Sequence, residues 1–208
     1  MEKTLTLTLH PDSLKIFSPL FQEGIILKTQ VNGPIRDFLW RHFGLSTDYQ
    51  EARIQTLFLN GKAVDNPAKA IVRDGATLAL SGAMPGLVGA TLRRGGTFAS
   101  LRQPITLSGS EEDIPETDGQ VILKLFNLLV PEIGPLLLAK GFWVRGTDFD
   151  KLVGTDPKNF WSHWSPVLLN GQKMDARVLE QTTWAPESED PILIKITFRP
   201  NPDQPEPK

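Results

Sequence analysis

Residues 35–43 read IRDFLWRHF. Five of their side chains fall at positions i, i+3, i+4, i+7 and i+8, namely Ile35, Phe38, Leu39, His42 and Phe43. That spacing predicts one apolar face of an α-helix, on which His42 is interpreted as a partly buried structural histidine. Pro34 precedes the stretch and Gly44 follows it, which is typical of a helix start and of a left-handed helix end. We expect a short helix that packs across a sheet.

Strands are expected on both sides of this helix. Residues 4–9 alternate threonine with leucine and residues 25–31 also alternate, and this period of two indicates a half-buried strand. An antiparallel pairing of these two strands is one option. Residues 54–59 and 76–80 are expected strands after the helix, and Asn60-Gly61 predicts a hairpin because a type I′ turn needs positive φ twice. This order predicts an α+β protein with a β-grasp, or ubiquitin-like, N-terminal domain.

Two stretches of this region carry a family resemblance. Residues 58–64 read FLNGKAV, and residues 72–80 read VRDGATLAL. They resemble the molybdopterin-synthase small subunits and the thiamine-pathway sulfur carriers, which carry a VNG-x-x-V strand and turn and then a DGD-x-V-x-L turn and strand. The resemblance covers about residues 3–90 and implies the β-grasp fold. It also implies the chemistry of that family, in which a free C-terminal Gly-Gly carboxylate is adenylated and made into a thiocarboxylate.

Changes in composition divide the rest of the chain. Residues 82–96 are rich in glycine, and we assign them as an extension of a β-grasp-like domain over residues 1–108. Residues 109–119 are acidic and lack periodicity, which is typical of a linker. Residues 120–199 are expected to form a smaller mixed α+β region, and residues 200–208, with four prolines, a disordered tail.

A second Asn-Gly hairpin is expected in the C-terminal region. Residues 167–175 read VLLNGQKMD and repeat the pattern of residues 57–65, which read LFLNGKAVD. Two explanations are open. One is a duplicated domain, and the other is that two hairpins need the same turn chemistry and reached it independently.

Composition excludes several classes of function. The 208 residues include no cysteine, which excludes disulfides, thiolate zinc sites, cysteine-ligated iron–sulfur clusters and cysteine nucleophiles. His10, His42 and His163 are too widely spaced in sequence to predict a metal site, so we expect no metal and no cofactor. A formal net charge of -2 gives no electrostatic reason to expect nucleic acid. No window approaches the roughly 18 apolar residues of a membrane span, and no secretory signal follows Met1, so we expect a cytoplasmic protein without membrane contact.

The end of the Gly-rich extension is a candidate functional segment. Leu92-Arg93-Arg94-Gly95-Gly96 resembles the end of ubiquitin, but the chain continues past Gly96, so carrier chemistry would need a cleavage there. A plain glycine-rich loop is the alternative that we favour. A third interpretation is an anion site, in which backbone N–H groups and the two arginines bind a phosphate.

Residues 160–165, FWSHWS, form the densest aromatic cluster of the chain. Aromatic rings beside a titratable imidazole can bind or process a small organic ligand. In the structural alternative, which we favour, the rings fill a core and the histidine makes a satisfied hydrogen bond. The residues assigned to the ligand interpretation are Trp161 and Trp164 for binding and His163, Asp148 and Asp150 for catalysis.

No set of residues in the sequence predicts catalysis more strongly than a structural role. We therefore expect a non-catalytic binding or interaction module with a protein partner, whose candidate binding residues are Arg93, Arg94, Gly95 and Gly96 together with the two tryptophans. The alternatives are a sulfur-carrier-like protein processed after Gly96 and a small-ligand enzyme that uses His163. The sequence leaves the oligomeric state open.

Overall fold

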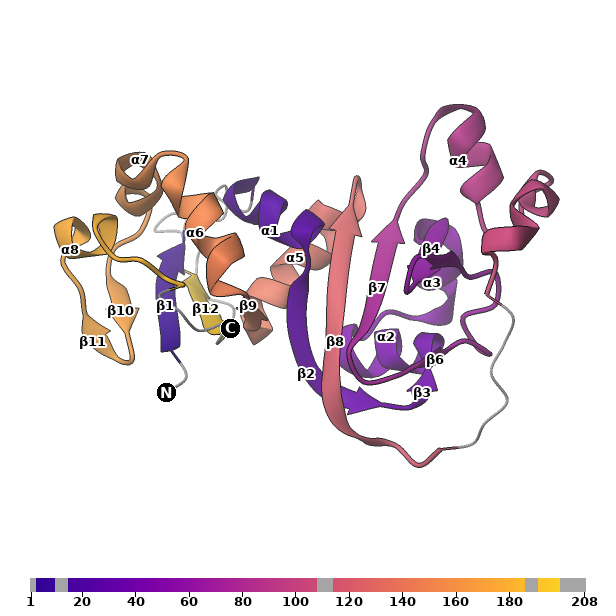
Figure 1. Cartoon of the computed structure of the whole chain (residues 1–208), viewed down its shortest axis with the longest axis horizontal. Coiled ribbons are helices and arrows are strands. Elements are labelled where there is room, and N and C mark those ends of the chain that lie inside the picture. The colour runs from indigo at the N-terminus through magenta and orange to yellow at the C-terminus, as the bar shows by residue number, and fades with distance from the viewer. Residues whose placement is uncertain (1–2, 10–14, 108–113, 186–190, 199–208) are drawn as a thin grey trace, which may run out of the picture. The chain divides into compact units, whose positions relative to one another are not determined.

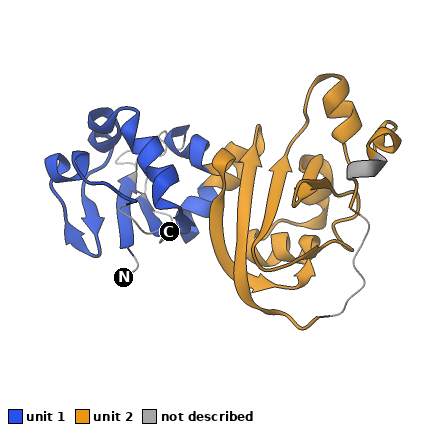
Figure 2. Cartoon of the chain, viewed as in Figure 1, with its two compact units in different colours: residues 1–20, 135–208 blue, residues 21–134 orange. Residues whose placement is uncertain are grey.

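The computed structural model describes residues 3–9, 15–107, 114–185 and 191–198, and the fold is α+β (Figure 1). The chain divides into two compact units (Figure 2). Unit 1 contains residues 1–20 and 135–208, and unit 2 contains residues 21–134. The unit boundaries fall inside the helices α1 (Ser18–Glu23) and α5 (Leu129–Lys140).

In unit 2, five strands are hydrogen-bonded to one another in the order β2-β8-β7-β4-β5. Strands β7 and β8 are parallel, and the other neighbours are antiparallel. A separate antiparallel pair, β3 and β6, lies in the same unit. Its elements are β2 (Ile25–Val31), β3 (Gly33–Pro34), α2 (Ile35–Phe43), α3 (Thr47–Arg53), β4 (Thr56–Leu59), β5 (Lys62–Ala63), β6 (Ile71–Val72), β7 (Ala76–Ser81), α4 (Gly86–Leu92), the 3-10 helix η2 (Ala99–Ile105) and β8 (Thr117–Phe126).

The predicted helix over residues 35–43 is confirmed as α2. It begins after Pro34 and ends at Gly44, which has a φ of 70° and donates its N–H to the carbonyl of Trp40. Four of the five stripe residues are buried, and His42 is partly exposed. One face of the sheet is buried where leucines stand at alternate positions of β7 and β8. The opposite face carries Phe58 of β4, Ala79 of β7 and Phe126 of β8. We call it the open face, because these side chains are only partly buried.

Residues 3–9 form a strand, β1 (Lys3–Leu9), but this strand does not pair with residues 25–31. It lies in unit 1 between β10 and β12, antiparallel to the first and parallel to the second. The antiparallel partner of β2 is β8, whose buried Val121 and Leu123 lie opposite Leu27 and Ile25. The expected pairing of residues 3–9 with residues 25–31 is therefore wrong, because alternation fixes which face of a strand is buried but not which strand lies beside it.

In unit 1, five strands are hydrogen-bonded to one another in the order β9-β12-β1-β10-β11. A layer of aromatic side chains from its helices is buried in this unit. Besides β1, its elements are β9 (Phe142–Val144), α6 (Gly146–Gly154), α7 (Pro157–Ser162), β10 (Val167–Leu169), β11 (Gln172–Lys173), α8 (Ala176–Glu180) and β12 (Ile192–Phe198).

The two units share one order of strand directions. In both units, the first strand of the order, β2 or β9, has an antiparallel neighbour, which is followed by a strand parallel to that neighbour and then by an antiparallel hairpin. The hairpins also share their hydrogen bonds. The Asn60 N–H donates to the Thr77 carbonyl and the Thr77 N–H to Asn60 Oδ1, each at 2.8 Å. Asn170 and Thr4 exchange the same two bonds, also at 2.8 Å.

The units differ from the domain boundaries expected from the sequence. Unit 2 takes in residues on both sides of the expected linker at 109–119, and Thr117–Gly119 open β8. Residues 109–113 of that linker, and the tail at 200–208, lie outside the described residues. Pairing of β8 with β2 and β7 keeps the residues on both sides of the expected linker in one unit.

Candidate functional site

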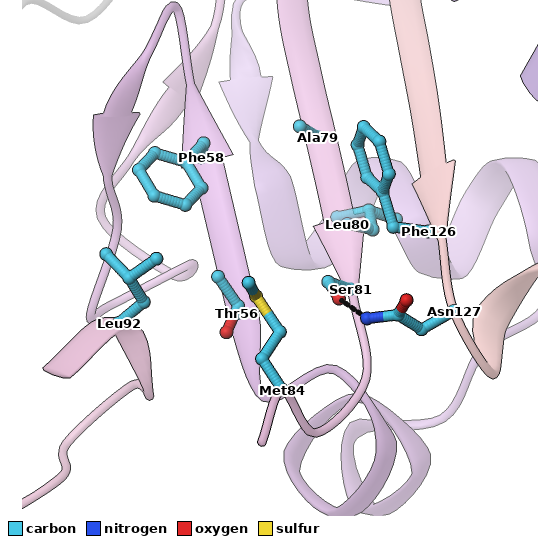
Figure 3. Close-up of a pocket in the computed structure, with 9 residues that line it drawn as sticks. All are labelled: Thr56, Phe58, Ala79, Leu80, Ser81, Met84, Leu92, Phe126 and Asn127. Atoms are coloured by element: carbon cyan, nitrogen blue, oxygen red, sulfur yellow. Dashed lines mark hydrogen bonds between the residues drawn. The ribbon is translucent and has the colours of Figure 1, made fainter. Parts of the chain in front are cut away.

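An apolar cavity of about 260 Å³ lies on the open face of unit 2. Because side chains alternate along a strand, Phe58 of β4 and Ala79 of β7, which are paired in register, point to the same face. Phe126 of β8 lies opposite Ser81 and points to that face as well. The lining residues are Thr56, Phe58, Ala79, Leu80, Ser81, Met84, Leu92, Phe126 and Asn127 (Figure 3).

Two of the polar side chains that line the cavity are hydrogen-bonded to each other. Asn127 Nδ2 donates to Ser81 Oγ at 3.0 Å, the dashed line of Figure 3. Met84 lies beside Thr56, and Leu92 lies on the same side of the view as Phe58, with Phe126 and Asn127 on the other side (Figure 3). The rest of the surface is mostly hydrocarbon and sulfur, so the cavity can accept an apolar group but offers little to an ion.

The crossover segment, residues 82–107, borders this cavity. Adjacent parallel strands need a long connection, and here that connection carries α4 and η2 between β7 and β8. Among the residues of α4, Gly89 alone is buried. Four large apolar side chains of the segment are between 46% and 71% exposed: Leu87, Val88, Phe98 and Leu101. Such a grouping of exposed apolar side chains is typical of an interaction surface.

A buried arginine holds the crossover segment to the β4–β5 hairpin. Arg102 has a side-chain exposure of 2%, and its Nη2 donates to Asp65 Oδ1 at 2.5 Å. Its other donors reach the carbonyl oxygens of Thr91 and Arg93 and the hydroxyl of Thr106. Burial tends to raise the pKa of Asp65, but the hydrogen bonds from Arg102 and the Gly95 N–H outweigh it and hold that pKa below its ordinary value.

The predicted binding residues Arg93 and Arg94 line a second cavity of unit 2, also about 260 Å³. Arg93 Nε and Nη2 donate to Gln55 Oε1 at 2.9 and 2.6 Å. Arg94 Nη2 donates to the Gln50 carbonyl at 2.9 Å. Burial lowers the pKa of Arg94, against the opposing charges of Glu51 and Asp65. The structure thus brings the two arginines together with α3 and the start of β4.

Gly95 and Gly96 follow these arginines in a turn rather than an extended tail. Gly95 has a φ of 58°, and its N–H donates to Asp65 Oδ1 at 3.1 Å. The Gly96 N–H donates to the Arg93 carbonyl at 3.2 Å. A cleavage after Gly96, as carrier chemistry requires, would separate this turn from Arg102, which anchors it. The contacts favour the loop interpretation.

The aromatic cluster of residues 160–165 belongs to the core of unit 1. Trp161 and Trp164 are 1% and 4% exposed. Trp161 packs edge-on against Phe149, and Trp164 lies against Phe17 with ring centres 5.4 Å apart. Neither tryptophan offers a surface to a ligand, which supports the structural interpretation of this cluster.

His163 lies on the surface and lines a cavity of about 240 Å³ in unit 1. Its Nδ1 is 2.6 Å from the Asn159 carbonyl oxygen. The two aspartates assigned to orient it bind elsewhere. Asp148 is buried and accepts from Arg145 and Lys151, so its pKa lies below the ordinary value although burial works the other way. Asp150 accepts the N–H groups of Trp184 and Ala185 at 2.7 and 2.9 Å. The three residues do not form a catalytic set.

Sequence reasoning missed the apolar cavity and Arg102. Phe58, Ala79 and Phe126 come from three strands whose neighbours are fixed only by long-range pairing. The signal that could have found the cavity is the position of Phe58 between Leu57 and Leu59, because in a strand it must point to the face opposite theirs. Within the described ranges no three His, Asp or Glu side chains are grouped to bind a metal, and no helix has the length and apolarity to cross a membrane.

We expect Gly89→Ala to displace α4 and lower the stability of unit 2 by about 2 kcal/mol. A Cβ at this position would lie 1.9 Å from the backbone oxygen of Met84, and backbone cannot yield as a flexible side chain can. Thermal unfolding measures the change. Gly154→Ala in α6 is the control, because a Cβ there meets nothing within 4 Å. Equal stability of the two variants would contradict the packing of α4.

No protein-family model, no curated protein and no solved structure matches this chain. The cavities and contacts of the chain itself therefore carry the functional assignment.

Proposed function

We propose that this protein is a non-catalytic binding module that takes an apolar side chain of a protein partner into the cavity on the open face of unit 2. The observation that carries the proposal is this cavity, lined by Phe58, Leu92 and Phe126, in a unit whose crossover segment also exposes large apolar side chains. An anchor side chain in a pocket, surrounded by apolar contacts, is the usual arrangement of a binding hot spot.

The size and polarity of the cavity agree with this occupant. Small-molecule sites usually start near 300 Å³, and a dry cavity of about 150 Å³ is enough for a benzene ring. The volume of about 260 Å³ therefore suits one aromatic or branched side chain better than a whole cofactor. Leu87 and Val88 on α4 would extend the contact beyond the anchor, since both are exposed.

Unit 1 offers a comparison for the open face. Asn60 bonds Thr77 in unit 2 as Asn170 bonds Thr4 in unit 1. Counted from these threonines along the paired strands, Ala79 of unit 2 corresponds to Thr6 of unit 1, and Phe126 corresponds to Thr197. In unit 1 this face is polar, and the hydroxyls of Thr8 and Thr197 lie 3.1 Å apart in a hydrogen bond. The apolar character of the face in unit 2 is therefore not required by the sheet itself, which supports a role in binding.

We also propose that unit 2 is a β-grasp-like sheet in which β8 takes the place assigned from the sequence to residues 3–9. β8 is antiparallel to β2, as that first strand was expected to be, and α2 lies behind β7 and β8 in the view of Figure 1. β-grasp domains commonly bind partners through a sheet face or edge, in agreement with the proposed site.

Toluene, the side-chain analogue of phenylalanine, tests the cavity. With ¹³C-methyl methionine, we expect a saturable shift of the Met84 methyl signal, while Met174 of unit 1 stays unchanged. Ala79→Leu should abolish the shift, because the added carbons enter the cavity. Thr77→Leu is the matched control, since it lies on the same strand and face but outside the lining.

The partner is tested by selecting displayed random peptides on the immobilised protein. We expect enriched peptides with an aromatic or leucine anchor that bind Thr77→Leu but not Ala79→Leu. Peptides that bind both variants equally, together with no toluene shift at Met84, would disprove the proposed site.

A further inference from the structure

The second cavity of unit 2 is independent of the apolar one. It is lined by Glu51 and Ile54 of the α3 region, Gln55, and the two arginines Arg93 and Arg94. Gln55 comes directly before Thr56, and neighbouring side chains of an extended chain point to opposite faces. The arginine cavity and the apolar cavity therefore lie on different sides of β4.

The arginine cavity holds donors that the fold leaves unused. Arg94 places one nitrogen, Nη2, on the Gln50 carbonyl, while its Nε–H is buried and has no hydrogen-bond partner among the described residues. Arg93 uses Nε and Nη2 on the single oxygen Oε1 of Gln55. A buried donor without a partner is costly, and a guanidinium has five donors in a planar fork that suits carboxylate and phosphate oxygens.

The charges in the cavity favour an anion. Two guanidinium groups face one carboxylate, that of Glu51, which leaves an excess of one positive charge. Burial lowers the pKa of Arg94, so the fold stabilises this cation less than water does. Glu51 compensates part of that cost, and a bound anion would compensate more.

We propose that Arg93 and Arg94 form a binding site for an oxyanion, either a carboxylate or a phosphate group. The segment that presents them is held in place, because the Arg94 N–H donates to the Gln55 carbonyl at 2.8 Å and the Gly95 N–H to Asp65. A preorganised pair of guanidiniums loses little freedom on binding, which favours recognition by a site of this size.

The test is a titration of ¹⁵N-labelled full-length protein with inorganic phosphate and, separately, with acetate, at constant ionic strength. We expect saturable shifts at the amides of Gln55, Arg94 and Gly95. Arg93→Gln should weaken binding about tenfold, because it removes a charged donor. Glu51→Gln should tighten binding several-fold, because it removes the competing carboxylate.

Two control variants separate binding at this site from a general attraction of anions to arginine side chains. Arg36→Gln changes the net charge equally but lies outside the cavity, so it should leave the affinity unchanged. Ala79→Leu should also leave it unchanged, which keeps this outcome distinct from that of the apolar cavity. Tighter binding of phosphate than of acetate assigns a phosphate ligand, and the reverse assigns a carboxylate. Absence of localised shifts, or equal binding by Arg93→Gln and wild type, would overturn the site.

Discussion

Arg102→Met is expected to release the crossover segment from the β4–β5 hairpin and to lower the stability of unit 2 by about 3 kcal/mol. The guanidinium is buried and makes four hydrogen bonds, three to the crossover segment itself and one to Asp65. Methionine keeps the apolar stem but makes none of these bonds. The carbonyl oxygens of Thr91 and Arg93 then lose their charged donor.

Hydrogen exchange measured by mass spectrometry locates the effect. Peptides over α4 and η2 should lose protection first, and the toluene shift at Met84 should weaken because Leu92 no longer holds its wall. Arg36→Met, which removes a largely exposed guanidinium from the same unit, is the control and should change stability by less than about 1 kcal/mol. Unchanged protection of α4 in Arg102→Met would show that the segment is held by other contacts.

The ion pair between Asp65 and Arg102 should make the stability of unit 2 depend on pH in a definite direction. The pKa of Asp65 is lower in the folded protein than in the unfolded chain, where it is about 3.9. The stabilisation by Asp65 is therefore fully present above pH 4 and is lost as the pH falls through the folded pKa. The stability difference between wild type and Arg102→Met should shrink on acidification below pH 4. A difference that stays constant to pH 2 would contradict the role of the ion pair.

Local patterns predicted local structure well. The stripe on residues 35–43, the alternation in residues 3–9 and the turn at Asn60-Gly61 each correspond to an observed element. These features depend on neighbours within a few residues, so their physical causes are present in the sequence itself. They located helices and strands, including the β4–β5 hairpin, which is followed by Asp65, the acceptor of the Arg102 hydrogen bond.

Partners distant in sequence could not be predicted in the same way. The alternation in β1 fixes which face is buried but not which strand lies beside it, and its neighbours come from residues 167–169 and 192–198. The buried role of Arg102 was hidden for the same reason. An arginine in a polar stretch is usually exposed, and only the fold brings Asp65 and Thr91 to it.

The two Asn-Gly hairpins bear on the question of duplication. Independent turn chemistry explains the positive φ of Asn60 and Asn170, which are 49° and 50°. It does not explain why each asparagine exchanges the same two bonds with a threonine, Thr77 or Thr4, on the third strand in the order of its unit. Each hairpin also follows two short helices, α2 with α3 and α6 with α7. The agreement over strands, helices and hairpin favours a repeated unit.

Leu5→Ala is expected to destabilise unit 1 by about 3 kcal/mol, although Leu5 stands at the beginning of the chain. Its side chain is fully buried, and in register it lies between Leu169 of β10 and Ile194 of β12. Amides of β10 and β12 should lose protection against hydrogen exchange, whereas those of β4 and β7 should keep it. Under the pairing expected from the sequence, with residues 3–9 beside residues 25–31, the loss would fall in unit 2 instead.

Two further substitutions make this test decisive. Thr6→Ala changes the opposite face of β1 and should cost less than about 1 kcal/mol, since that side chain is only half-buried. Leu78→Ala removes the residue that corresponds to Leu5 in unit 2 and should move the loss of protection to β4, β7 and β8. Four of the five tryptophans lie in unit 1, so Leu5→Ala should shift the fluorescence transition more than Leu78→Ala does. If Leu5→Ala instead exposes the amides of β2 and spares those of β12, then β1 pairs with β2 of unit 2, and the division into two units is wrong.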